Sequence, residues 1–363
     1  MIKLLYTVNG LRVNGVSAVI MQYITMLNKK DYEISLVTDE IAPQFRQVLQ
    51  DNHINVITSA NRKKNQLAYY KELKGIIKGG KYDIIHAHGN SATLAVEMLA
   101  ARKCGVAIRI AHSHNTTCVH KIFDKMLRPI FYKTYTYGIG CGDEAGKWLF
   151  GSHPHMVIKN GIDLKKFSFD FQKRTEIRNK LGINDKYVVG HIGRFTDQKN
   201  HDFIIEVFES YLKNNLDSVL LLLGDGPRES EIKALVKEKN LENYVIFYGT
   251  TSDTSAFYSA FDIFLFPSKF EGVPLTLVEA QANGLTCLIS DKISPEVIIT
   301  ELISVKSLSD KAEWVQALQH ISLQQREQNS RQAVKDLTQA GFEISSVLKQ
   351  VDELYKSAKG ADK

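Results

Sequence analysis

The stretch FDIFLFPSKFEGVPLTLVEAQANGLTCLISD, residues Phe261–Asp291, predicts a strand, a loop, a helix and a second strand. Ile263–Phe266 is a short apolar run that ends at Pro267, which is typical of a buried parallel strand. Pro274 suits the first helical turn, where no amide donor is needed, and Gly284 suits the helix end. Such a unit belongs to a parallel sheet with helices on its faces.

Two carboxylates lie on this unit. Glu271 precedes the helix, and Glu279 lies within it, about 7.5 Å beyond Pro274 at ~1.5 Å per residue. A helix start offers free N–H groups and the positive end of a dipole, which together attract phosphate. We therefore expect a diphosphate at the helix start. On each side of it, one of the two carboxylates would accept hydrogen bonds from hydroxyl groups of the ligand. A plain strand-to-helix turn with two surface acids is the alternative.

The same string closely resembles the E-x7-E signature of the retaining glycosyltransferases of family 4, the bacterial polysaccharide-type enzymes with the two-domain GT-B fold. Pro267-Ser268 precedes Glu271-Gly272, and Glu279 closes the signature. The resemblance implies that Glu271 holds hydroxyls of the donor sugar at the reacting centre and that Glu279 holds the ribose. It also implies nucleotide-sugar contacts at Gly272, Val273, Pro274 and Leu275.

A second motif, Gly193-Arg-Phe-Thr-Asp-Gln-Lys-Asn200, follows a predicted strand at Tyr187–Ile192. It resembles the G-R-x-x-x-x-K motif of the same family. Arg194 and Lys199 lie on one loop, so both cations could meet one diphosphate, and a guanidinium offers a two-pronged contact. A solvated basic loop is the alternative. By position in the family, Gly224 and Gly249 would lie beside the nucleobase and ribose.

Strands and helices alternate through residues 1–160 and again after Tyr187, which predicts two α/β, Rossmann-like, doubly wound domains. With the resemblance, this gives a GT-B architecture in which the domains face a central cleft. We expect an N-terminal acceptor domain at 1–165 and a donor domain at 166–343. A final helix at 344–363 would cross back to the N-terminal domain.

Residues at the carboxyl ends of parallel strands gather at one sheet edge, where ligands bind. Three features of the first domain fall there: the loop Asn9–Ser17 with Gly15, the pair His86/His88 and the pair His112/His114. The resemblance implies that Gly15 lets the backbone approach the diphosphate, although the usual Gly-Gly pair is missing, and a flexible turn is the alternative. It favours His114, then His112, as catalytic residues beside the reacting sugar. Core histidines or a metal site are the alternatives, and we expect no metal.

Net charge is +6, but residues 1–165 carry 22 Lys and Arg against 12 Asp and Glu, whereas the remainder is net −4. We expect the basic half to meet an anionic membrane, and no nucleic acid, because no reader motif is present. One basic run spans Arg62–Lys64 and continues through Lys71, Lys74, Lys78 and Lys81. In the other, Lys121–Lys133, cations alternate with large apolar residues, as in an interfacial helix. Apolar packing on the sheet with solvated lysines is the alternative.

Scattered cysteines, the lack of a signal-peptide pattern and the lack of a long apolar run indicate a cytoplasmic protein. It would lie peripherally at the inner face of the membrane. No Asp-x-Asp occurs in the chain, so we expect metal-independent transfer from a nucleotide-sugar, UDP-sugar favoured, without any cofactor. The acceptor would be a glycan or a lipid-linked glycan in cell-surface polysaccharide synthesis. A sugar-nucleotide epimerase and a non-catalytic subunit remain alternatives.

Overall fold

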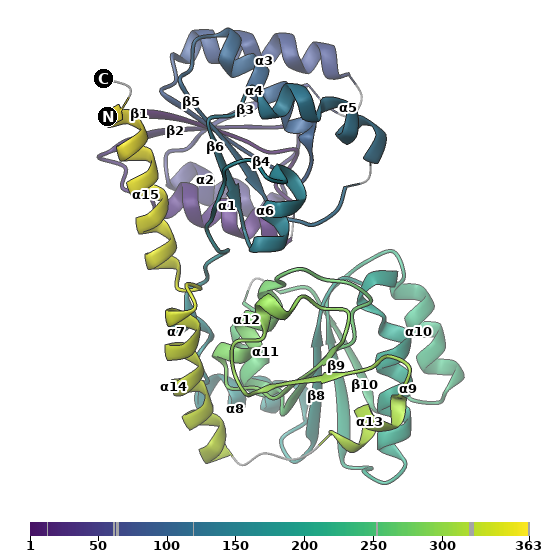
Figure 1. The fold of residues 1–363 in the computed structure, drawn as a ribbon. Helices are drawn as coiled ribbons and strands as arrows, with labels where there is room; N and C mark the ends of the chain where they lie inside the picture. The colour runs from purple at the N-terminus through teal and green to yellow at the C-terminus, as the bar shows by residue number, and fades with distance from the viewer. Residues whose placement is uncertain are drawn as a thin grey trace. The chain divides into compact units, whose positions relative to one another are not determined.

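The computed structural model describes residues 1–12, 14–60, 62, 65–118, 120–251, 253–318 and 323–361. The chain divides into two compact units (Figure 1). Unit 1 comprises Met1–Gly161 and Ile344–Lys363, and unit 2 comprises Ile162–Glu343. The observed division falls after Gly161, four residues before the limit expected from the sequence. It differs because the short helix α7, Leu164–Phe167, buries Leu164 and Phe167 in the core of unit 2.

Unit 1 is built on a seven-stranded parallel sheet in the order β3-β2-β1-β4-β5-β6-β7. The order reverses between β1 and β4, which is the switch point of a doubly wound sheet. The central strands are buried on both faces, so they read as apolar runs in the sequence. Their bounds are β1 Ile2–Thr7, β2 Tyr32–Thr38, β3 Asn55–Thr58, β4 Ile84–Gly89, β5 Ile108–Ser113, β6 Tyr137–Gly140 and β7 Met156–Val157.

Helices connect these strands and cover the sheet (Figure 1). Their bounds are α1 Gly15–Met26, α2 Pro43–Asp51, α3 Gln66–Gly80, η1 Ala92–Leu94, α4 Ala95–Lys103, α5 Lys121–Tyr132 and α6 Asp143–Phe150. The sequence analysis did not predict α2 or α6. Both are short, and α2 buries only Leu49, although its apolar residues Phe45, Val48 and Leu49 have the i, i+3, i+4 spacing of a helix.

The last helix, α15 (Ile344–Ala361), belongs to unit 1 although it follows unit 2 in the chain. It runs beside the sheet in Figure 1, where its yellow ribbon ends near β1. Tyr32 donates a hydrogen bond to Asp352 of α15, at 2.6 Å. Lys359 Nζ donates to Asp83 Oδ1, at 2.8 Å. Buried Val347, Val351, Leu354 and Tyr355 form its apolar face.

Unit 2 repeats the same topology with six parallel strands in the order β10-β9-β8-β11-β12-β13. Its switch point lies between β8 and β11. The strands are β8 Tyr187–Ile192, β9 Ser218–Leu223, β10 Val245–Gly249, β11 Ile263–Phe266, β12 Cys287–Ser290 and β13 Ile303–Lys306. The helices are α8 Phe171–Leu181, η2 Asp197–Lys199, α9 His201–Leu212, α10 Glu229–Glu238, α11 Ser255–Ala260, α12 Leu275–Ala282, η3 Pro295–Val297, α13 Lys311–Gln316 and α14 Leu323–Gln339.

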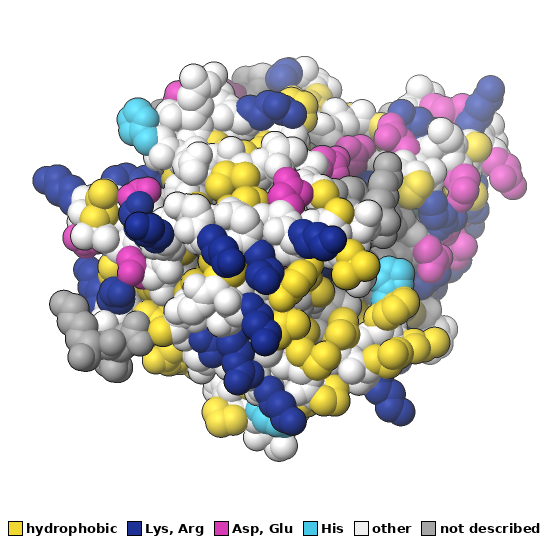
Figure 2. Space-filling model, turned by 90° about the horizontal axis from the view of Figure 1, so that it is seen from above, with side chains coloured by type: hydrophobic (Ala, Val, Ile, Leu, Met, Phe, Trp, Pro, Cys, Tyr) yellow, Lys and Arg dark blue, Asp and Glu magenta, His cyan; other side chains and the backbone are white. Residues whose placement is uncertain are grey.

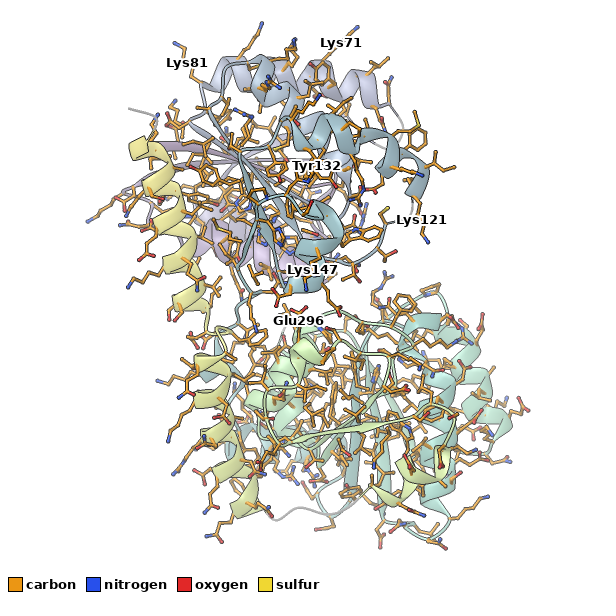
Figure 3. The ribbon with its side chains drawn as sticks, in the orientation of Figure 1. Lys71, Lys81, Lys121, Tyr132, Lys147 and Glu296 are labelled. Carbon is orange, nitrogen blue, oxygen red and sulfur yellow. The ribbon has the colours of Figure 1, made fainter. Side chains whose placement is uncertain are left out.

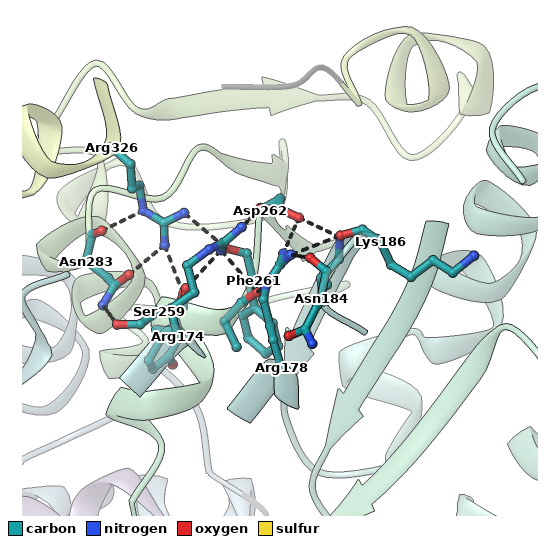
Figure 4. Close-up of polar contacts among 12 residues, drawn as sticks. Arg174, Arg178, Asn184, Lys186, Ser259, Phe261, Asp262, Asn283 and Arg326 are labelled. Carbon is teal, nitrogen blue, oxygen red and sulfur yellow. Dashed lines mark hydrogen bonds and ion pairs between the residues drawn. The ribbon is translucent and has the colours of Figure 1, made fainter. Parts of the chain in front are cut away.

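Three buried arginines fasten the outer helices of unit 2 to its sheet (Figure 4). Arg174 and Arg178 of α8 both pair with Asp262, which precedes β11. Arg326 of α14 donates to the carbonyls of Tyr258, Phe261 and Asn283. The carbonyl groups at the ends of α11 and α12 would otherwise be buried without donors, so the arginines satisfy them. This bonding keeps α12 fixed beside the switch point.

Candidate functional site

The two motif loops of unit 2 lie at its switch point and are hydrogen-bonded to each other. One loop follows β8 and contains η2, and the other follows β11. Lys269 N donates to Gln198 O at 2.8 Å, and Gln198 Nε2 donates to Phe270 O at 2.9 Å. Lys269 Nζ also lies 2.6 Å from Asp197 Oδ1. The sequence motifs that were recognised separately therefore form one surface at the carboxyl ends of β8 and β11.

Lys199 and Glu271 form an ion pair in this surface, with Nζ 2.7 Å from Oε1. Their side chains are only 16% and 13% exposed, so water screens the pair weakly. The Lys199 ammonium also lies over the Phe266 ring, 4.4 Å from its centroid. The sequence analysis assigned these two residues to phosphate and to sugar separately. The structure brings them together.

Arg194 is placed differently from Lys199. Its Nε lies 3.6 Å from Asp225 Oδ1, and both side chains are 61% exposed. An exposed pair of this length contributes little, and the guanidinium is free to reorient towards an anion. The two predicted phosphate-binding cations thus lie on one loop but have separate carboxylate partners.

The start of α12 presents backbone donors beside the Lys199–Glu271 pair. Pro274 is the N-cap, and no side chain of the described residues caps this helix end. The Thr276 hydroxyl is buried without a hydrogen-bond partner among the described residues. Gly272 to Leu275 are half-buried. Free N–H groups, a positive helix dipole and a nearby ammonium are the components of an anion site.

Glu279 lies further along α12, where its side chain is half-buried. It accepts a hydrogen bond from the Tyr258 hydroxyl at 2.8 Å. Burial raises the pKa of Glu279 to about 7, against the opposing effects of Tyr258 and Lys166. A carboxyl group with this pKa changes its charge near neutral pH, so a ligand hydroxyl that donates to it would favour the ionised form.

The loop after β9 packs tightly on the Arg194 loop, which explains its glycines. Gly224 and Gly226 have φ values of +142° and +155°. A Cβ on Gly224 would lie 2.1 Å from Gly193 O, and one on Gly226 would lie 2.5 Å from Phe195 O. Phe195 N donates to Asp225 O at 2.7 Å. Gly249, at the end of β10, adopts φ +82° and accepts a hydrogen bond from Gly224 N.

In unit 1 the four histidines lie side by side at the ends of β4 and β5. His86 Nε2 lies 3.2 Å from His112 Nδ1, and His88 Nδ1 lies 2.8 Å from His114 Nε2. Burial lowers the pKa of His86, His88 and His112 well below the usual range, and that of His114 to about 4. All four are therefore neutral imidazoles at pH 7.

A metal ion fits this cluster poorly, although one nitrogen each of His86, His88 and His112 lie within 4.8 Å of one another. A metal lies in the plane of each imidazole that binds it, so ligand rings must converge. Here the rings of His86 and His88 stack, with centroids 4.2 Å apart at 22°, and the nitrogens of His86 and His112 that face each other lie at hydrogen-bond distance, 3.2 Å. The nitrogens of stacked rings lie in nearly parallel planes, so their lone pairs do not converge on one metal ion. Absence of metal stays a prediction.

Gly15 is the first residue of α1, at the carboxyl end of β1. The Asn14 side chain caps this helix, accepting from Ser17 N at 2.9 Å. Arg12 N donates to the Ser17 hydroxyl at 3.0 Å, so the loop is held against the helix start. The glycine of this loop with a positive φ is Gly10, at +141°. Val13 lies outside the described residues.

Several residues at these sites had no signal in the sequence. Tyr258 bonds Glu279, Phe266 lies under Lys199, and Tyr355 reaches the histidines from α15. His191 and His201 lie behind the Lys199 loop, with ring centroids 4.8 Å apart. A tyrosine in a short helix and a phenylalanine in a strand are ordinary core residues, so only tertiary contacts reveal these roles.

The surface of α5 mixes exposed apolar and basic side chains. Ile122, Phe123, Met126 and Ile130 are 76%, 54%, 67% and 42% exposed. Phe131 is buried, and Leu127 and Tyr132 pack against the core of the sheet, so only part of the apolar set is covered. Figure 2 shows basic and hydrophobic side chains side by side on one face. In Figure 3, Lys121 projects from α5, and Lys71 and Lys81 from the α3 segment.

Arg62, expected in the α3 basic run, instead lies buried and pairs with Glu97 at 3.0 Å. It therefore contributes no charge to the surface, and Lys63 and Lys64 lie outside the described residues. Among the helices described, none combines the length and apolar character that a membrane crossing requires.

Comparison with known proteins agrees with this architecture. Residues 13–166 match the family model Glycosyltransferase Family 4, and residues 173–336 match Glycosyl transferases group 1. Putative glycosyltransferase EpsF of Bacillus subtilis is 30% identical over 335 residues, covering 86% of each chain. An Escherichia coli UDP-Gal:α-D-GlcNAc-diphosphoundecaprenol α-1,3-galactosyltransferase is 28% identical over 300 residues, covering 77% of this chain and 76% of that one.

Solved structures give the same fold. HepE of Anabaena in complex with UDP-glucose aligns with a TM-score of 0.82 over 98% of this chain and 100% of that chain, at 18% identity. WaaG, a glycosyltransferase involved in lipopolysaccharide biosynthesis, aligns with a TM-score of 0.76 over 97% and 99%, at 14% identity. The protein is thus a GT-B glycosyltransferase. It belongs to glycosyltransferase family 4.

Proposed function

We propose that this glycosyltransferase moves a sugar from UDP to an acceptor hydroxyl with retention of anomeric configuration. The observation that carries the proposal is the ion pair of Lys199 and Glu271 beside the uncapped start of α12. It offers a cation and backbone donors to a diphosphate and a carboxylate to the adjoining sugar. HepE, which shares the fold, is known in complex with UDP-glucose, which favours a UDP-sugar as donor.

In this proposal each residue has a separate part. Lys199, Arg194 and the N–H groups of α12 stabilise the diphosphate as negative charge develops on it. Glu271 accepts hydrogen bonds from hydroxyls of the donor sugar, and Glu279 accepts them from the ribose. Gly15, Gly224, Gly249 and residues Gly272 to Leu275 allow close backbone approach to the donor. His114 and His112 contact the reacting sugar.

The reaction needs no external base. The acceptor oxygen attacks the anomeric carbon on the face that the diphosphate leaves, and the bond from that carbon to the phosphate oxygen breaks. The departing phosphate oxygen takes the proton of the acceptor hydroxyl, so charge and atoms balance. Catalysis is then mainly positioning and electrostatic stabilisation. The chain contains no Asp-x-Asp, and we propose that the cations replace a divalent metal.

The acceptor is proposed to be a lipid-linked glycan at an anionic membrane, used in cell-surface polysaccharide synthesis. The four exposed apolar residues of α5 lie on the same helix as Lys121 and Lys125, as in an interfacial helix. The E. coli relative carries diphosphoundecaprenol in the name of its acceptor. This combination favours an enzyme that works from the cytoplasm at the inner membrane face.

The test is incubation of the protein with an isotopically labelled UDP-sugar and a lipid extract, in EDTA, followed by NMR of the anomeric carbon of the product. The proposal expects a labelled lipid whose anomeric configuration equals that of the donor. An inverted product would contradict retention. An isomerised UDP-sugar formed without acceptor would instead indicate an epimerase.

A further inference from the structure

A chain of hydrogen bonds runs from the last helix to the end of β5. The Tyr6 and Tyr355 hydroxyls lie 2.7 Å apart. The Tyr355 hydroxyl lies 2.5 Å from His86 Nδ1, and His86 Nε2 lies 3.2 Å from His112 Nδ1. All four side chains are buried. Beyond the chain, His112 Nε2 is buried and has no hydrogen-bond partner among the described residues.

The protons along this series of hydrogen bonds can be arranged in only two consistent ways. Each neutral imidazole carries one N–H, so either His86 Nε2 donates to His112 Nδ1 or the reverse holds. In the first arrangement Tyr6 donates to Tyr355, Tyr355 donates to His86, and His86 donates to His112. His112 then carries its own proton on Nε2. In the reverse arrangement His86 donates to Tyr355, Tyr355 donates to Tyr6, and His112 Nε2 is a bare lone pair.

The first arrangement is favoured because it leaves fewer buried groups unpaired. It leaves one donor, His112 Nε2–H, without a partner among the described residues. The reverse leaves two, since among the described residues the Tyr6 hydroxyl proton has no acceptor besides Tyr355 and His112 Nε2 has no donor. Each buried unpaired group carries the cost of its lost hydration without a compensating hydrogen bond.

We propose that Tyr355 is a positioning residue which, through His86, holds His112 in the tautomer that carries its proton on Nε2. His112 then presents a fixed N–H donor, and its partner is an oxygen atom of the bound sugar or of the departing phosphate. His112 is not a general base in this state. The tautomer follows from the fold alone, whereas the identity of the oxygen rests on the proposed function.

The proposal also assigns a role to helix α15. α15 follows the donor domain in sequence, yet it supplies the one hydroxyl that bonds both Tyr6 and His86. Loss of α15 from its place would free His86 Nδ1 and remove the bias on His112. Nothing in the sequence of α15 marks Tyr355 apart from its place on the apolar face, with Val351 and Leu354.

The test is long-range proton–nitrogen NMR of the full-length protein labelled with ¹⁵N-histidine, which reports directly which ring nitrogen carries the proton. His112 signals are assigned by their loss in His112→Gln. In the wild type we expect both His86 and His112 to be protonated on Nε2 and not on Nδ1. In Tyr355→Phe, His112 should lose this single state and show a mixture. A wild-type His112 protonated on Nδ1, or an unchanged His112 in Tyr355→Phe, would overturn the proposal.

Tyr32→Phe is the matched control, because the Tyr32 hydroxyl donates to Asp352 of the same helix and not to a described histidine. It should leave the histidine tautomers unchanged. Once an acceptor is known, Tyr355→Phe should lower kcat about tenfold and leave KM for the donor within about twofold, as expected for one misdirected hydrogen bond. If no transfer occurs in the wild type, the proposed function fails while the NMR result still decides the tautomer.

Discussion

Lys199 Nζ lies 2.7 Å from Glu271 Oε1, in a pair that is mostly shielded from water. A diphosphate that enters beside Lys199 therefore meets a cation already neutralised by a carboxylate. The donor sugar can relieve this competition, because its hydroxyls can donate to Glu271 while the phosphate binds Lys199. The pair thus favours a ligand that carries both groups over a phosphate alone.

We expect the two cations of the Lys199 loop to contribute unequally to donor binding. Lys199→Ala should weaken UDP-sugar binding at least about tenfold, since a charge-assisted hydrogen bond contributes ~1.5–3 kcal/mol. Arg194→Ala should also weaken binding and slow turnover, but by less, because Arg194 is largely exposed. Isothermal calorimetry and turnover measure both effects. Unchanged affinity and turnover in both variants would remove these residues from the donor site.

Substitution of the two glutamates should have different effects on binding and transfer. Glu279→Gln should weaken binding of free UDP, because its expected partner is the ribose. Glu271→Gln should preserve or strengthen UDP binding, since it removes a negative charge beside Lys199, and should cut transfer because its partner is the sugar. Calorimetry with UDP and initial rates with the UDP-sugar separate the two. A larger loss of UDP affinity at Glu271 than at Glu279 would reverse the assignment.

Donor affinity should depend on pH through Glu279. Burial raises the pKa of Glu279 from 4.5 to about 7. The protonated carboxyl therefore contributes to the free energy of unfolding, and this contribution is fully present below about pH 4.5. It is lost as pH rises through about 7. Ribose hydroxyls favour the ionised form, so affinity should rise from pH 6 to pH 8 and then level off. A UDP-sugar is the right probe because its doubly esterified diphosphate does not titrate there. The trend should vanish in Glu279→Gln, and its persistence there would point to another group.

Membrane docking should depend on the basic residues of α5. The protein should sediment with liposomes that contain phosphatidylglycerol, less so at high salt, because roughly 1 kcal/mol is gained per cation near an anionic surface. Lys121→Glu/Lys125→Glu should release it. Lys237→Glu/Lys335→Glu makes the same charge change at exposed sites of unit 2 and should not. Wild-type protein that stays in the supernatant at low salt would favour a soluble acceptor.

The arginine cluster of unit 2 should control its stability. Arg326→Lys keeps the charge but lacks the planar fork that reaches three carbonyls, so it should lower the free energy of unfolding by about 2–3 kcal/mol. Arg331→Lys, on the exposed side of the same helix, is the control and should stay within about 0.5 kcal/mol. Urea unfolding measures both. Equal stabilities would show that the buried carbonyls do not need Arg326.

The sequence predicted the parallel sheets well because their strands are buried on both faces. Ile263–Phe266 was placed to the residue, since Pro267 ends the apolar run. The helix that follows was expected from its proline and glycine, and it spans Leu275–Ala282. Helix α2 was missed although Phe45, Val48 and Leu49 repeat at helical spacing behind Pro43, because the segment is short, at nine residues. A short helix that buries one residue carries a briefer pattern than a strand that is buried on both faces.

The motif residues were identified from the sequence, but the side chains that they contact were not. Arg194 and Lys199 were treated alike, whereas their surroundings differ because only Lys199 folds back over Phe266 towards Glu271. The pairing of Tyr258 with Glu279 and of Tyr355 with His86 joins residues from different elements. Such contacts depend on how strands and helices pack, and no spacing in the chain encodes them visibly.

Thermal unfolding in EDTA with a panel of UDP-, GDP- and ADP-sugars tests the central claim most directly, comparing wild type with Lys199→Ala. A ligand that binds only the folded state raises Tm as its concentration exceeds Kd. We expect a UDP-sugar to raise Tm of the wild type without added metal, more than free UDP does, and to raise Tm of Lys199→Ala much less. Equal shifts in both proteins, or a shift that appears only after Mn²⁺ or Mg²⁺ is added, would contradict the account.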